Sequence, residues 1–329
     1  MAVQQLGMSV AGMQTRGAPL SVETARFADE LGYSSAWVAE ANAAEAFSLL
    51  GAIGASTTHV GLGTGVIALQ LRTPPTAAMA AATLQQLVGD RDIFLGIGIS
   101  SPVVAGQWHG AEYGTRPLAQ VREYVALVRE CLAGEAVTFD GDFYSVKRFR
   151  LGARLGERRP KIVVGALNAK MLRLAGEIAD GVLLNYLPAS LVPWCVERVR
   201  EGGDAAIYAY VHCAVTDRER WADAARKDLF SYAVVDAYAE NFSRAGYADD
   251  VAALRERWGE RDRDGALAAI GDRWVDEVQI MGDAAHVGRE VRAYADRGVD
   301  VPIVFAVPWG EDRRATVRST LEAVAPDNK

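Results

Sequence analysis

Short apolar runs alternate with longer segments of helical period along the whole chain. Eight runs are expected to be strands: residues 6–10, 36–39, 60–69, 93–99, 161–165, 181–184, 207–215 and 301–306. In the segments between most of them, apolar residues recur every three or four positions, which is the spacing of a helix that buries one face. Regular alternation of strands and helices requires a parallel sheet with both faces covered.

Several of these helices carry recognisable signals at their ends. Pro74 and Pro117 stand where helices are expected to begin, because proline fits the first helical turn. Ser21 and Asn168 are predicted N-caps, and Gly134 is a predicted C-terminal stop.

Eight strand–helix units in 329 residues favour a closed (β/α)₈ TIM barrel over an open doubly wound sheet. Residues 217–277 are charged and helix-prone, and they follow the seventh expected strand. We therefore expect a helical insertion there, within a single domain that covers residues 1–329. The glycines at 61, 63 and 65 and at 96 and 98 do not complete a dinucleotide-binding fingerprint, which argues against a Rossmann fold.

Composition restricts the classes of partner that the chain is expected to bind. A net charge of −7 argues against nucleic acid or an acidic membrane surface as a partner. Cys131, Cys195 and Cys213 are far apart and show no metal or disulfide spacing. The N-terminus has no signal-peptide pattern and no apolar run is long enough to span a bilayer, so we expect a cytoplasmic protein.

In TIM barrels the site lies at the carboxyl ends of the strands. The residues expected at the first six ends are small or neutral polar, with Glu40 as the one acid and no histidine. Paired-carboxylate hydrolysis lacks a second acid, the four histidines have no metal spacing, and Ser100 and Ser101 lack a nucleophile-elbow sequence. Such ends suit a large planar ligand held by backbone contacts.

Two of these strand ends carry candidate chemistry. Glu40 could act as a general acid or hydrogen-bond a cofactor ring, or it could be a salt-bridged strand end. The segment Gly165-Ala166-Leu167-Asn168 ends a strand in glycine and starts a helix, so its free N–H groups and helix dipole could bind a phosphate. An ordinary tight turn has the same sequence.

Six further segments point to a family: 27–33 (FADELGY), 37–40 (WVAE), 61–66 (GLGTGV) followed by 72–74 (RTP), 83–87 (TLQQL), 94–98 (FLGIG) and 107–110 (QWHG). The most telling segment is 174–185, LAGEIADGVLLN. With these segments the chain resembles the luciferase-like flavin barrels, and within them the branch that uses the deazaflavin coenzyme F420. These segments lie between residues 27 and 185, about half of the chain.

The resemblance implies an oxidoreductase and a set of cofactor-binding residues. The Gly65–Val66 peptide matches a place where the family often holds a cis bond, 100–103 matches a cofactor loop, 165–168 matches the phosphate turn, and Glu40 and Asn42 match positions beside the ring. Cofactor contacts are thus expected from Asn42, Thr64, Gly65, Val66, Ser100, Ser101, Val103, Gly165, Ala166, Leu167 and Asn168. The expected catalytic residues are Glu40 and His109. His109 could donate a proton or be a loop histidine bonded to backbone.

The implied reaction is hydride transfer between F420 and an unidentified small organic substrate. Relatives that reduce methylene-tetrahydromethanopterin carry an acid near Met8-Ser9-Val10. Those that oxidise glucose 6-phosphate carry Asp-His at Glu40-Ala41 and paired glutamates at Ser100-Ser101. Neither substrate is supported here. The family's frequent dimers imply a homodimer.

Two other functions stay open at this point. One is a monooxygenase of the same superfamily that depends on flavin mononucleotide (FMN), and the other is a cofactor-binding barrel without catalysis. A basic run before the fifth strand (Arg148, Arg150, Arg154, Arg158, Arg159, Lys161) could meet the anionic tail of the coenzyme or be a solvated linker. Tyr232, Tyr238 and Phe242 could wall the substrate side or form core.

Overall fold

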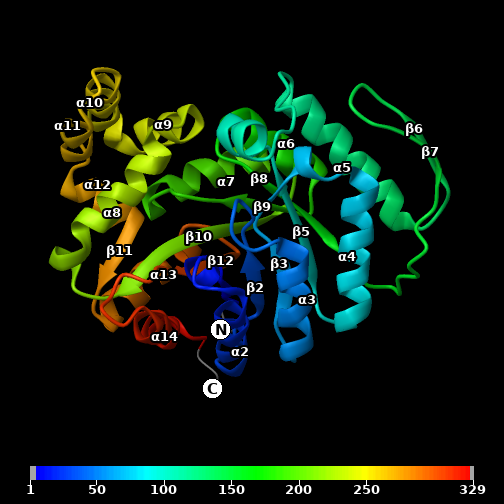
Figure 1. Cartoon of the computed structure of the whole chain (residues 1–329), viewed down its shortest axis with the longest axis horizontal. Coiled ribbons are helices and arrows are strands. Elements are labelled where there is room, and N and C mark those ends of the chain that lie inside the picture. The colour runs from blue at the N-terminus through cyan, green and yellow to red at the C-terminus, as the bar shows by residue number, and fades with distance from the viewer. Residues whose placement is uncertain (1–4, 327–329) are drawn as a thin grey trace.

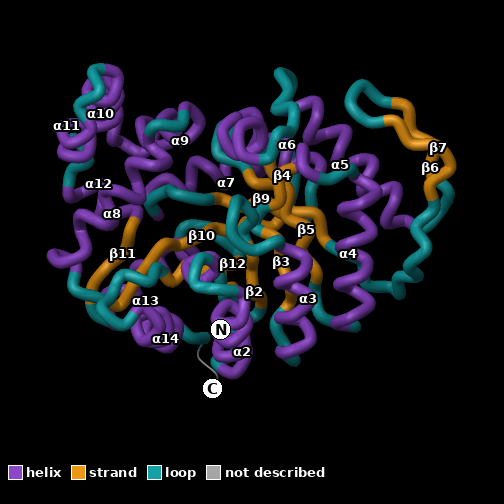
Figure 2. The backbone as a smooth tube through the Cα atoms, in the orientation of Figure 1, coloured by secondary structure: helices purple, strands orange, loops and turns teal. Residues whose placement is uncertain are grey.

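A ring of eight parallel strands forms the centre of the molecule (Figures 1 and 2). The computed structural model describes residues 5–326. In ring order the strands are β1 (Gly7–Ser9), β2 (Ser35–Val38), β3 (Gly61–Thr64), β5 (Ile93–Gly98), β8 (Lys161–Gly165), β9 (Gly181–Leu184), β10 (Ala206–Val215) and β12 (Val301–Ala306). Pairing of β9 with β10 and of β12 with β1 closes the ring, which confirms the predicted (β/α)₈ barrel.

Helices surround the ring and cover its outer surface (Figure 1). They are α2 (Ala18–Glu30), α3 (Ala46–Ser56), α4 (Pro74–Val88), α5 (Pro117–Ala133), α6 (Ala169–Ile178), α7 (Val192–Arg200), α13 (Ala284–Asp296) and α14 (Arg313–Val324). Their apolar faces and the outward side chains of the strands form one continuous core. Pro74 and Pro117 begin helices as predicted, and Gly134 ends α5 in a left-handed conformation.

Five helices follow β10 and lie together to one side of the barrel (Figure 1). They are α8 (Arg218–Ala233), α9 (Asp236–Phe242), α10 (Ala248–Gly259), α11 (Arg263–Ala268) and α12 (Asp272–Val278). They share a hydrophobic core of their own, in which Phe242 packs on Trp274 with ring centroids 4.8 Å apart. The chain then returns as β11 (Gln279–Gly282), which pairs with β10 outside the ring.

Some boundaries differ from those expected. Helix α2 begins at Ala18 after Gly17 and not at Ser21, because Pro19 already fits its first turn and Ser21 is buried inside it. The third run divides into β3, the short β4 (Ile67–Ala68) and the 3₁₀ turn Leu69–Leu71. The antiparallel hairpin of β6 (Val137–Asp140) and β7 (Ser145–Phe149) was not predicted and lies outside the barrel (Figure 2).

The barrel interior is filled by aromatic and branched side chains. Trp37 stacks on Phe94 with centroids 5.0 Å apart, and Tyr208 meets both rings. Tyr210 lies above Tyr208 on β10, two residues nearer the carboxyl end. The interior is therefore a packed core and not a pore, and any ligand must sit above it.

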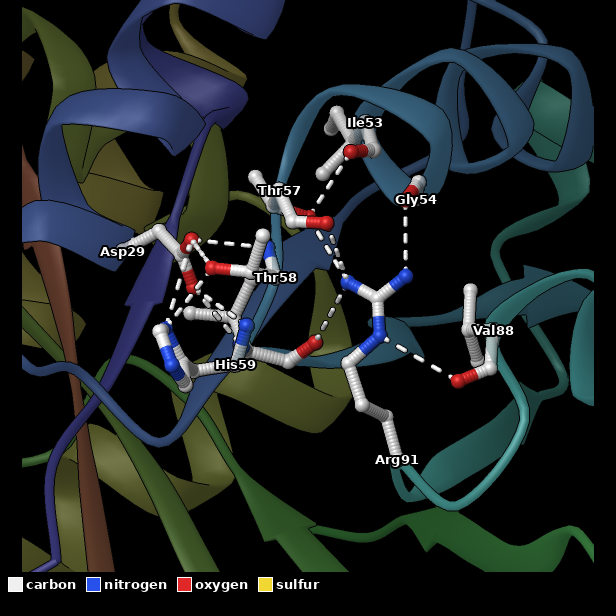
Figure 3. Close-up of polar contacts among 9 residues, drawn as sticks. Asp29, Ile53, Gly54, Thr57, Thr58, His59, Val88 and Arg91 are labelled. Atoms are coloured by element: carbon white, nitrogen blue, oxygen red, sulfur yellow. Dashed lines mark hydrogen bonds and ion pairs between the residues drawn. The ribbon is translucent and has the colours of Figure 1, made fainter.

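Polar contacts fix the amino end of β3 (Figure 3). The Asp29 carboxylate accepts hydrogen bonds from the backbone N–H groups of Thr58, His59 and Val60 at 2.8–2.9 Å. Arg91 donates to the carbonyl oxygens of Gly54 and Thr57 at 2.7 and 3.0 Å. This cluster lies at the end of the barrel opposite the strand termini where a site is expected, so its role is structural.

Two kinds of feature are absent from residues 5–326. No helix in this range is long and apolar enough to cross a membrane. The same range contains no cluster of three or more His, Cys, Asp or Glu side chains suited to a metal ion.

Candidate functional site

The carboxyl ends of the strands surround a mouth above the aromatic interior. Val66, Gly165, Asn185 and Phe305 follow or end four different strands, and each is partly exposed although the strand residues before it are buried. These four residues mark where a ligand can reach the barrel from solvent.

The chain after β3 runs close over the interior. The Gly65–Val66 peptide is cis, as the family resemblance implied. Tyr210, fully buried on the opposite side of the ring, donates its hydroxyl to the Gly65 carbonyl at 2.9 Å. A Cβ on Gly65 would lie 1.9 Å from the Tyr210 hydroxyl oxygen, so only glycine fits here.

The Val66 side chain lies in a slot bordered by glycines. A Cβ added to Gly98 would lie 2.7 Å from Val66 Cγ2, and one added to Gly165 would lie 3.3 Å from Val66 Cγ1. Thr64 is buried and donates its hydroxyl to the Gly96 carbonyl at 2.8 Å, so it braces β3 against β5. The ends of β3, β5 and β8 thus present backbone and one valine to the mouth.

The turn from β8 into α6 is built as an anion site could be. Asn168 occupies the N-cap position with extended backbone, but its side chain accepts no cap hydrogen bond. Its Oδ1 is buried and has no hydrogen-bond partner among residues 5–326. The first N–H groups of α6 therefore have no side-chain cap, which corrects the prediction that Asn168 caps the helix. Ala166 is buried, and Leu167 is partly exposed beside it.

The loop after β5 turns sharply and then winds into the π-helical turn Pro102–Trp108. Ser100 has a positive φ of 53°, which is uncommon for a residue with a side chain. Ser101 Oγ caps the turn by accepting from the Val104 N–H at 3.2 Å. Val103 is 43% exposed and Trp108 is 54% exposed, so this loop brings apolar side chains to the surface beside the mouth.

Glu40 follows the end of β2 and is one half of a charge pair. Both its carboxylate oxygens accept hydrogen bonds from the Arg72 guanidinium, and Oε2 also accepts from the Ala46 N–H at 2.9 Å. Arg72 bonds Glu45 too, and although burial alone would lower its pKa, these two carboxylates raise it. Glu40 is therefore a fixed carboxylate, and Asn42 is exposed in the loop beyond it.

His109 lies at the end of the π-helical turn and is exposed. Its Nε2 is 2.6 Å from the Ala41 carbonyl oxygen, so it links the loop after β5 to the loop after β2. The bond uses one ring nitrogen and leaves Nδ1 free for other contacts. Its predicted role as a proton donor stays a prediction.

A stack of rings crosses the mouth on the other side. Tyr232 of α8 stacks on Tyr186 at 3.8 Å, Tyr186 meets His212 at 4.1 Å, and His212 stacks on Phe305 at 4.3 Å. His212 Nε2 is 2.9 Å from Asn185 Oδ1. Burial lowers the pKa of His212 to about 3, so its ring is neutral at physiological pH.

The Asp228 carboxylate supports this stack of side chains from outside the ring of strands. Tyr186 donates its hydroxyl to Asp228 of α8 at 2.7 Å, and the Gln279 side-chain amide donates to the same oxygen. Burial raises the pKa of Asp228. Tyr186 itself has a positive φ of 50°, so the packed neighbours hold it in a sparsely populated conformation.

Sequence reasoning missed Arg72, Tyr210 and His212. His212 was weighed only as a metal ligand, because a histidine inside a strand does not show which way it points. The register β10 shares with β12 places His212 opposite Phe305. An alternation of Tyr208, Tyr210 and His212 could have indicated one inward-facing row.

The basic run before β8 lies away from the mouth. Lys161 begins β8 and pairs with Asp92 at 3.0 Å, and Arg158 is 3.4 Å from the same carboxylate. Because β8 ends at Gly165 in the mouth, its first residue is at the opposite end of the barrel. These side chains cannot meet a coenzyme tail at the strand ends.

The chain is similar to known proteins in sequence and in fold. The family model for luciferase-like monooxygenases matches residues 8–301. A Mycobacterium tuberculosis protein, provisionally named coenzyme F420-dependent oxidoreductase, is 32% identical over 85% of this chain and 88% of its own length. The 5,10-methylenetetrahydromethanopterin reductase of Archaeoglobus fulgidus is 26% identical over 92% and 94%. The solved F420-dependent tetrahydromethanopterin reductase of Methanopyrus kandleri has a TM-score of 0.82 at 20% identity, covering 98% and 99%.

Proposed function

The chain belongs to the luciferase-like monooxygenase family, and from this premise we propose that it is a coenzyme F420-dependent oxidoreductase. It transfers a hydride between the deazaflavin and a small organic substrate. The observation that carries the proposal is the glycine-bordered slot at the ends of β3, β5 and β8, above a packed aromatic interior. The Val66 side chain fills this slot, so the strand ends present backbone and one valine as a floor for a planar ring system.

The residues present fit the two parts of this coenzyme. Val66 and Gly165 would contact the ring, because both are partly exposed at the mouth, and Gly65 holds the backbone beneath them against Tyr210. The uncapped N-terminus of α6, with the unpartnered Asn168 Oδ1 beside it, supplies N–H donors for a phosphate. When bound, the coenzyme supplies the hydride chemistry. The chain binds, orients and shields it from water.

The other predicted residues take supporting places in the proposed site. Thr64 braces the strand beneath the ring, while Asn42, Ser100, Ser101, Val103, Ala166 and Leu167 lie in the loops around it. Glu40, fixed by Arg72, offers a carboxylate edge beside the ring. His109 is the exposed candidate for exchanging a proton with the substrate.

The substrate named for the methanopterin-reducing relatives is not carried over. At the end of β1 this chain has Met8, Ser9 and Val10, all buried, and the Ser9 hydroxyl accepts from the Ala11 N–H at 3.2 Å. No acid lies at this strand end, in keeping with the departure noted from the sequence.

We also carry forward the homodimer and the cytoplasmic location as predictions. Met79 and Leu87 on α4 are 50% and 64% exposed, and such apolar exposure on one helix supports a partner surface. Light scattering on the purified chain measures the mass of the particle and decides between monomer and dimer.

Binding of the coenzyme tests the main proposal. The purified protein is titrated with F420 and with FMN in separate experiments, and the quenching of tryptophan fluorescence is followed. We expect saturable quenching by F420, in part through Trp37 of the interior. Tight binding of FMN with none of F420 would overturn the proposal in favour of an FMN-dependent monooxygenase. F420 binding without oxidation or reduction at 420 nm across a broad substrate panel would favour a non-catalytic binding protein.

A further inference from the structure

The Asn185 side-chain amide, at the mouth, has one N–H donor that is not used within residues 5–326. Asn185 follows β9 directly and is partly exposed. Its Oδ1 faces His212 Nε2 at 2.9 Å, and its Nδ2 donates to the Tyr238 hydroxyl at 3.4 Å. An amide nitrogen carries two hydrogens. The second makes no hydrogen bond to any residue between 5 and 326.

His212 sets the direction of that amide. An amide oxygen only accepts, so the imidazole must carry its proton on Nε2. The ring is held on both faces, by Tyr186 at 4.1 Å and Phe305 at 4.3 Å, and it cannot turn away. Its buried Nδ1 has no partner among the described residues. His212 therefore fixes Asn185 with its oxygen toward the imidazole, which leaves the NH₂ group as the free end of a side chain that is partly exposed at the mouth.

The surroundings select an uncharged ligand. Phe305 is apolar and partly exposed on the same side of the mouth, and the imidazole beside it is neutral. The charged side chain in this network is the Asp228 carboxylate, which meets Tyr186 and would repel an anion. Desolvating an anionic group here without a paired cation would be costly.

We propose that Asn185, oriented by His212, donates a hydrogen bond to the oxygen of a neutral carbonyl substrate or of the corresponding alcohol. Asn185 is then a substrate-binding residue and His212 a positioning residue. This inference rests on the proposed function for its redox partner. Reduction of the carbonyl adds a hydride to carbon from the reduced deazaflavin, which becomes oxidised, and a proton to oxygen from His109, the proposed proton donor, and breaks the C=O π bond.

The test compares three probes of similar shape: cyclohexanone, methylenecyclohexane, which lacks the oxygen, and cyclohexanecarboxylate, which is anionic. Dissociation constants are measured by ligand-observed NMR on the F420-loaded protein, without turnover. Wild type should bind cyclohexanone more tightly than the carboxylate. Asn185→Leu should weaken cyclohexanone by about 3- to 12-fold, the worth of one neutral hydrogen bond, and leave methylenecyclohexane unchanged.

The positioning role has its own readout. His212→Phe keeps the ring stack but removes the Nε2 proton, and it should weaken cyclohexanone alone. The double variant should be no weaker than Asn185→Leu, because both changes remove the same contact. His59→Phe, at the amino end of β3 and with a side chain that is 80% exposed, is the matched control and should change nothing. The ¹⁵N spectrum of wild-type His212 should show a neutral, Nε2-protonated ring from pH 5 to 8.

Four outcomes would overturn the inference: no measurable binding of cyclohexanone, tighter binding of the carboxylate, equal losses of ketone and hydrocarbon in Asn185→Leu, or protonation of His212 on Nδ1. The proposed function fails separately. If F420 does not bind, the titrations are run on the protein alone, and a ketone preference that depends on Asn185 would still support the inference.

Discussion

Replacing Gly65 with alanine tests whether the site floor is as closely packed as described. The added Cβ would lie 1.9 Å from the Tyr210 hydroxyl oxygen, 2.9 Å from Tyr210 Cζ and 3.3 Å from Trp37 Cε3. Tyr210 and Trp37 are buried at 3% and 0% exposure, so neither ring can move into solvent. Forcing one methyl group into a packed interior costs about 1–3 kcal/mol.

Removal of the clashing atom should recover part of that loss. Tyr210→Phe alone leaves the Gly65 carbonyl without its donor, which costs about 1–3 kcal/mol. In Gly65→Ala/Tyr210→Phe the hydroxyl is absent, so the combined loss should be smaller than the sum by about 1 kcal/mol or more. Relief is partial, because Cζ stays within 2.9 Å of the added Cβ.

Urea unfolding of wild type, the two single variants and the double variant gives the coupling free energy between residues 65 and 210. Titration with F420 gives the effect on coenzyme binding. If the shifted floor displaces the ring, the affinity for F420 should fall in Gly65→Ala by about 5- to 150-fold, the equivalent of 1–3 kcal/mol. Gly51→Ala is the control, since nothing lies within 4 Å of its added Cβ. Additive losses, or a Gly65→Ala protein as stable as wild type, would refute the reasoning.

Four further substitutions separate the effects of charge, of stability and of coenzyme binding. Arg72→Met leaves the Glu40 carboxylate, 9% exposed, without its partner and should cost about 3 kcal/mol in urea unfolding; Glu40→Gln should cost less. Asp29→Asn should cost about 1–3 kcal/mol at pH 7 and leave F420 affinity unchanged. Burial raises the pKa of Asp29, but hydrogen bonds from three backbone N–H groups outweigh this and hold it below 3.8, so wild type should lose this stability as the pH falls through that lowered pKa, and the variant should not. Asn168→Asp should weaken F420 binding by about fivefold or more, since like charges a few ångströms apart repel by about 1–4 kcal/mol, yet it should spare binding of the phosphate-free deazaflavin riboside.

The fold was predictable because its signals are local and repeated. Apolar runs such as 93–99 and 161–165 are short and bounded, and eight of them in alternation with helices leave few architectures. The hairpin at 137–149 could not be predicted, because its strands are largely exposed and its polar residues do not alternate cleanly with apolar ones. Helix starts were misplaced where proline, as at Pro19, fixed the first turn ahead of a plausible cap.

The site could be predicted only to the extent that the ends of the strands could be located in the sequence. Gly65 and Gly165 could be located because strand ends converge in a barrel. Contacts across the ring could not, since Tyr210 and Gly65 are 145 residues apart in the chain. The pairing of Asn185 with His212 depends on the register of β9 and β10, which the sequence does not display.

The polar groups at the mouth share one property, which is that their charges are cancelled or absent. Glu40 is paired with Arg72, His212 is neutral, and Asn168 and Asn185 are uncharged donors or acceptors with atoms left free. Such a mouth orients the bound molecules and excludes water. It offers little acid or base catalysis. That division suits hydride transfer, in which the coenzyme carries the reactive electrons and the protein holds the two partners in place.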